Sequence, residues 1–184
     1  MSASSHRPTD EVARPQAGQS TVELALTLPV LVLLLMSAFN ISVLLSDKLI
    51  AGYATRQGAR LAAELGSGGG TMSTSTIDQE ICQDVKASSG GLNYASITRI
   101  DVYAPSSAAG VYSSTDPHNS YDASCAAITT SPPFPNTSRN QTPPNETSIG
   151  VQITWQYTPP TGVYSFSMQF SEYTVMKAAP VLPG

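Results

Sequence analysis

One long apolar run near the N-terminus limits what this 184-residue chain can fold into. It extends from Leu24 to Leu45 and is interrupted only by uncharged polar residues, namely Thr27, Ser37, Asn40 and Ser42. As an α-helix the run is about 33 Å long, which is enough to cross a hydrocarbon core of about 30 Å. Soluble cores rarely need so many leucines and valines in succession, so the sequence predicts one membrane-spanning helix over residues 24–45.

The composition agrees with a protein that is embedded in a membrane or packed into an assembly. Only 12% of the residues are charged, against about 25% in average soluble domains. The net charge is −4 and the basic residues are scattered along the chain, so we expect no nucleic-acid partner.

The sequence carries no recognisable catalytic centre. No fingerprint of a phosphate-binding loop, a zinc peptidase or a serine hydrolase occurs in it. His118 has Asp116 and Asp122 nearby, but ligands from a single loop are poor evidence for a metal site. We therefore expect no enzyme activity, no cofactor, no metal and no small-molecule substrate.

Residues 1–18 precede the predicted span. They are polar, contain prolines and lack hydrophobic periodicity, which predicts a disordered leader. The apolar run that follows is too long for a secretory signal, and no A-x-A pattern closes it. Basic residues flank the span on both sides, so charge alone does not settle its orientation.

The junction between leader and span carries a recognisable pattern. Gly18 is followed after four residues by Glu23, in the string GQSTVE, which resembles the processing site of type IV prepilins. The longer string GQSTVELALTLPVLVLLLMSAFNIS, continued by AGYATRQGARLAA, resembles the TadE-like family of pilin-like proteins. That family belongs to the tight-adherence (Flp) pilus machinery, a type IV pilus system. Leu24 departs from the family pattern, because an aromatic residue is usual after the glutamate.

The resemblance implies a structural function. A prepilin peptidase would cut between Gly18 and Gln19 on the cytoplasmic side, leaving the C-terminal domain outside the bacterial cytoplasmic membrane or in a surface pilus. The protein would be a minor pilin-like subunit or an assembly factor, with other pilin-like subunits and the pilus assembly platform as partners. The alternative is a single-pass anchor that presents an extracytoplasmic binding domain and is neither cleaved nor polymerised.

Three residues of the span are candidates for a role in assembly. The resemblance implies that Glu23 pairs with the freed α-ammonium of a neighbouring subunit; alternatively it is solvated and only favours the start of the helix. Pro29 removes one helical hydrogen bond, which predicts a kink or a melted turn, although spanning helices also tolerate proline. Asn40 can hydrogen-bond across packed helices, at roughly 0.6–2 kcal/mol.

The span is predicted to continue outside the membrane. Apolar residues recur at helical spacing over residues 46–65, and small residues give this stretch a smooth surface that lets helices approach closely. We therefore expect one transmembrane and stem helix over residues 19–65. The glycines that follow predict a Gly/Ser-rich hinge over residues 66–73.

Residues 74–184 predict a small α+β domain of the type IV pilin kind. A short helix over residues 74–86, capped by Ser75 or Thr76, precedes three strands over residues 94–104, 149–157 and 163–171. Alternation in the strands predicts an antiparallel sheet with one apolar face, with Trp155 and Phe166 in the core. Between the first two strands, residues 105–148 are rich in Ser, Thr, Pro and Asn and predict a long, exposed and structureless loop.

Cys82 and Cys125 are the only cysteines, and both follow the span on the side expected to be oxidising. We expect a disulfide between them, which would tie the long loop to the short helix. The alternative is a pair of free thiols, one of them buried in the helix face.

Overall fold

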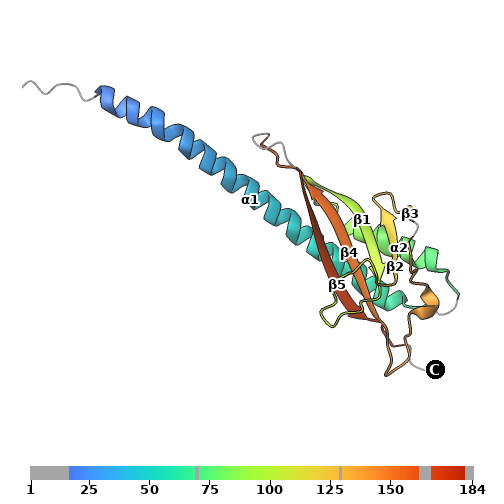
Figure 1. Ribbon diagram of the computed structural model, residues 1–184. Coiled ribbons are helices and arrows are strands. Elements are labelled where there is room, and N and C mark those ends of the chain that lie inside the picture. The colour runs from blue at the N-terminus through green and yellow to red at the C-terminus, as the bar shows by residue number, and fades with distance from the viewer. Residues whose placement is uncertain (1–16, 69–70, 129, 162–166, 181–184) are drawn as a thin grey trace, which may run out of the picture. The chain divides into compact units, whose positions relative to one another are not determined.

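The computed structural model describes residues 17–68, 71–128, 130–161 and 167–180 (Figure 1). The chain forms two compact units, residues 1–39 and 40–184. The elements are a long N-terminal helix, a second short helix and a five-stranded antiparallel sheet. The predicted α+β class with a long apolar N-terminal helix is therefore confirmed, and the expected three strands become five.

Helix α1 extends over Ala17–Leu65 and continues through Pro29, so the turn there is not melted and the kink stays a prediction. A proline removes only one backbone hydrogen bond, and the turns on either side keep theirs. The helix ends where the sequence predicted, because Gly66 takes a left-handed φ of +46° and its N–H bonds to Ala62 O at 2.9 Å. The first residues of the predicted hinge are held by the domain, because the Ser67 hydroxyl donates to Gln141 Oε1 at 3.0 Å.

Helix α2 extends over Thr74–Ser88. Its N-cap is Ser73, whose hydroxyl accepts a bond from Thr76 N, rather than the Ser75 or Thr76 that we predicted. Its buried face consists of four apolar residues and one acid, namely Ile77, Asp78, Ile81, Cys82 and Val85.

The sheet has the order β3-β2-β1-β4-β5, and its neighbouring strands are all antiparallel. The strands are β1 (Ala95–Tyr103), β2 (His118–Asp122), β3 (Ala127–Ile128), β4 (Ser148–Tyr157) and β5 (Met168–Lys177). Two of them, β2 and β3, lie in the segment 105–148 that we predicted to be structureless. The third predicted strand lies further along the chain than expected, and Phe166, which we predicted in the core, lies outside the described residues.

One face of the sheet is apolar and packs against α2 and the second part of α1 (Figure 1). The predicted core position of Trp155 is confirmed, because this side chain is fully buried and stacks on Phe170 of β5 with a centroid distance of 4.8 Å. Gly150, Gln152 and Thr154, on the other face of β4, are also buried. Every inward residue of β4 is at most 2% exposed: Ile149, Val151, Ile153, Trp155 and Tyr157.

The small residues of α1 lie against this sheet and α2. Five alanines of α1 are at most 6% exposed, namely Ala51, Ala54, Ala59, Ala62 and Ala63. At Gly58 the helices approach closely: a Cβ there would overlap Val85 Cγ2 and lie 3.3 Å from Val151 Cγ1. The smooth surface predicted for packing with other helices is thus largely occupied by the chain's own domain.

This close approach gives a matched pair of glycine variants. Gly52→Ala meets no atom within 4 Å, so the better helix former should raise the free energy of unfolding by about 0.5–1 kcal/mol. Gly58→Ala makes the same substitution, but its added methyl group meets the Val85 side chain. Overpacking should therefore make the free energy of unfolding of this variant about 1–3 kcal/mol lower than that of the Gly52 variant. Denaturant unfolding of the full chain in detergent measures the difference, and equal stabilities would contradict the packing described here.

Candidate assembly helix and its attached domain

The first unit presents its apolar side chains outward. Within α1, Val22 is 59% exposed, Leu26 is 70% exposed and Leu34 is 63% exposed. The part of α1 from Ser20 to Leu65 is long and apolar enough, by length and composition, to cross a membrane. A core helix of a soluble protein would bury such leucines, so this surface requires a lipid environment or other apolar helices around it.

The predicted processing and pairing residues lie at the start of this helix. Gly18 and Gln19 are in its first turn, and Glu23 follows one turn later. The Glu23 side chain is exposed, and its carbonyl accepts a bond from the Thr27 hydroxyl at 2.9 Å. Cleavage after Gly18 and pairing of Glu23 with a neighbouring subunit stay predictions.

Asn40, at the start of the second unit, has an intramolecular role that the sequence did not reveal. Its side chain is 9% exposed and donates to Thr161 Oγ1 at 3.0 Å, while its carbonyl accepts a bond from the Tyr157 hydroxyl at 3.1 Å. Both partners lie at the β4–β5 turn, more than a hundred residues away in sequence. Asn40 therefore holds this turn against α1, and its amide nitrogen is already engaged.

Beyond Asn40, α1 carries two different faces. The alanine face is buried, and a second stripe of large apolar side chains, spaced four residues apart, stays exposed by 54–67%. This exposed stripe consists of Ile41, Leu45, Leu49 and Tyr53. It continues two turns past the predicted end of the span at residue 45.

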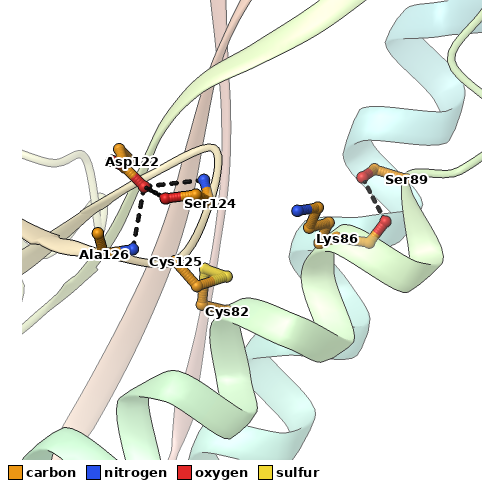
Figure 2. Close-up of a disulfide and its surroundings, with 7 residues drawn as sticks. All are labelled: Cys82, Lys86, Ser89, Asp122, Ser124, Cys125 and Ala126. Carbon is orange, nitrogen blue, oxygen red and sulfur yellow. Dashed lines mark hydrogen bonds between the residues drawn. A yellow bond between two sulfur atoms is a disulfide. The ribbon is translucent and has the colours of Figure 1, made fainter.

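The predicted disulfide is confirmed between Cys82 of α2 and Cys125 (Figure 2). It joins Cα atoms 5.8 Å apart across a sequence separation of 43 residues. Cys125 lies in a tight turn in which Asp122 Oδ1 accepts bonds from the Ser124 hydroxyl, Ala126 N and Ser124 N. The Ser124 hydroxyl, followed by the two N–H groups, lowers the pKa of Asp122, and the Lys86 charge lowers it further.

A buried ionic network, which we did not predict, joins α2 to the 105–148 segment. Asp78 and Arg139 are both fully buried, and Arg139 Nη1 lies 2.6 Å from Asp78 Oδ1 as an ion pair outside ideal hydrogen-bond geometry. Asp78 Oδ2 accepts three further bonds, from Arg139 Nη2 at 2.9 Å, Asn119 Nδ2 at 2.7 Å and Tyr121 Oη at 3.1 Å. Burial, and then the nearby Asp78 charge, raise the pKa of Tyr121 above its ordinary value.

The sequence does not by itself pair Asp78 with Arg139. The available signal was an isolated acid on an otherwise apolar helix face, which requires a buried partner. The Arg139 guanidinium also lies over the Phe134 ring, 4.7 Å from its centroid, and donates to Phe134 O at 3.1 Å. The 105–148 segment is therefore anchored to the core by a charge, an aromatic ring and the disulfide.

The structure places the other polar candidates in structural roles. His118 Nδ1 lies 2.7 Å from the backbone oxygen of Asp116, while Asp122 bonds within its own turn. Across the described residues, no group of three or more His, Cys, Asp or Glu side chains is placed to hold a metal ion.

Residues 18–60 match the sequence model of a family described as TadE-like protein. The N-terminal segment of this chain is similar to TadE-like proteins. The match confirms the resemblance found at Gly18 and covers most of α1, whereas α2 and the sheet lie outside it. No curated protein and no solved structure matches the chain.

Proposed function

We propose that the chain is a structural, non-enzymatic subunit of a tight-adherence pilus system, either a minor pilin-like subunit or an assembly factor. One observation carries this proposal: the TadE-like match coincides with the helix whose large apolar side chains are exposed. The part of the chain that is related to pilus proteins is thus the part that needs lipid or similar helices around it.

In this proposal the helix is processed before it assembles. A prepilin peptidase cuts between Gly18 and Gln19 on the cytoplasmic side, and the outer domain lies outside the cytoplasmic membrane. The new α-ammonium of Gln19 then meets Glu23 of a neighbouring subunit. An acid within a spanning helix costs on the order of 2.5–3.5 kcal/mol, and pairing offsets part of that cost.

Replacing Glu23 by Gln tests the pairing step. We expect at least a tenfold loss of assembled pilus, which corresponds to about 1.4 kcal/mol, with the amount of membrane-inserted subunit unchanged. Glu64→Gln is the matched control, because Glu64 is exposed on the stem and pairs with Arg60 at 2.8 Å. Immunoblotting of sheared pili against the membrane fraction gives the ratio, and normal assembly of the Glu23→Gln protein would contradict the pairing.

N-terminal sequencing of the membrane-extracted protein separates the proposal from a plain anchor. A chain that begins at Gln19 is expected for a processed subunit. A chain that begins at Met1 or Ser2 would instead support the uncleaved membrane-anchored binding protein.

A further inference from the structure

Strand β1 is paired on both sides along only part of its length. β4 pairs with it from Ala95 to Tyr103, but β2 pairs only with its second part, from Arg99 to Tyr103. Within the part of the chain that the structure describes, no strand lies on the β2 side of residues 95–98. β2 ends here because the chain turns at residues 122–126, where the Asp122 bonds and the disulfide to α2 hold it.

We call this stretch the open edge of β1, and its pairing with β4 shifts register between Ile97 and Arg99, as at a β-bulge. Its sequence is Ala95-Ser96-Ile97-Thr98, with neither a proline nor a charge. Ser96 and Thr98 are exposed. An unpaired strand edge presents backbone N–H and C=O groups that bind an extended peptide.

A groove lies on the helix side of the open edge. It has a volume of about 340 Å³ and lies between β1, the C-terminal end of α2 and the turn at Ala123. Its apolar lining includes Leu92, Ile97 and Ile100, and its one charged lining residue is Lys86. Figure 2 shows Lys86 extending from α2 on the side of the Asp122 turn. The groove has room for one apolar side chain of a bound peptide, and an acidic side chain of the same peptide would lie beside Lys86.

A second groove lies across the sheet near the same edge. It has a volume of about 430 Å³ and is lined by Thr98, Arg99, Thr154, Gln169, Phe170 and Ser171. Arg99 is its one charged lining residue; its side chain is 40% exposed, and its Nε is already paired with the buried Asp101 carboxylate at 2.8 Å. Successive side chains of a strand point to opposite faces of the sheet. A peptide strand added beside residues 95–98 would therefore direct its own side chains alternately toward the two grooves.

We propose that the open edge of β1 is a docking site for an extended, acidic segment of another protein. The segment adds to the sheet where β2 stops, places an apolar side chain in the groove lined by Leu92 and Ile97, and directs a carboxylate toward Lys86. The backbone edge selects an extended chain, and Lys86 selects its charge. This site lies outside the TadE-like segment, so a negative result at the site would leave the pilus proposal unaffected.

A synthetic peptide of alternating character tests the site. The probe is fluorescein-labelled Glu-Thr-Val-Glu-Val-Thr-Glu, titrated by fluorescence polarisation against the full chain in detergent micelles. We expect saturable binding, and at least tenfold weaker binding when lysine replaces each glutamate of the probe. Lys86→Glu should weaken binding of the acidic probe at least tenfold, whereas Lys177→Glu at the far end of β5 makes the same charge change and should not.

Hydrogen exchange of the same complex locates the peptide. Amides of residues 95–98 should gain protection when the probe binds, while those of β4 and β5 stay unchanged. Absence of saturable binding, protection at another place, or equal effects of the two lysine variants would each overturn the proposal. Protection of residues 95–98 that rises with protein concentration alone would identify a second copy as the occupant and would also overturn it.

Discussion

Replacing Arg139 by Met is expected to lower the free energy of unfolding of the full chain by about 3–5 kcal/mol. Met removes the guanidinium but keeps an apolar side chain in the same space. Asp78 then remains fully buried without the ion pair at 2.6 Å and without the bond to its Oδ2 at 2.9 Å. Asn119 and Tyr121 still donate to this carboxylate, but neither carries a positive charge.

Two controls separate the buried charge from a general loss of side chain. Arg60→Met removes the exposed pair with Glu64, whose side chains are 69% and 53% exposed, and should leave stability nearly unchanged. The double variant Asp78→Leu/Arg139→Met removes both charges and should recover a large part of the loss, because no charge is then left buried alone. Urea unfolding followed by Trp155 fluorescence measures all three variants. A loss in Arg139→Met no larger than that in Arg60→Met would show that the pair does not support the fold.

The parts of the fold that the sequence predicted are those encoded by neighbouring residues. Gly66 ends α1 because only a local left-handed turn is needed there, and the alternation in β4 identifies its apolar face directly. The TadE-like resemblance is also local, since it rests on one continuous stretch. Each of these signals lies within a few residues of the structure that it predicts.

The parts that the sequence missed depend on partners far apart in the chain. Asp78 and Arg139 are 61 residues apart, and Asn40 and Thr161 are 121 residues apart. β2 was missed for a related reason: its sequence His-Asn-Ser-Tyr-Asp is polar, and it is buried because its side chains bond to Asp78 and Asp101. A segment rich in Ser, Asn and Pro therefore folds here because the core supplies its polar partners.

Opening the disulfide should have an effect of similar size. In the chain-entropy model, a link between residues 43 apart contributes about 4 kcal/mol, because it restricts the unfolded chain. We expect Cys82→Ala/Cys125→Ala to lose about this amount of unfolding free energy relative to the oxidised protein. The native protein unfolded in the presence of reductant should lose a comparable amount, whereas the double variant should not respond to reductant.

The loss should also be uneven within the domain. The disulfide holds the turn that ends β2, so amide exchange should speed up most in β2 and β3 and least in β4, whose partners β1 and β5 remain in place on either side. Alkylation followed by mass spectrometry checks the starting state, and a non-reduced protein that accepts two alkyl groups would contradict the bond. Exchange that rises equally in all five strands would show that the link acts on the unfolded chain alone. In that case the hydrogen bonds of the Asp122 turn, and not the disulfide, would be what ends β2 at Asp122.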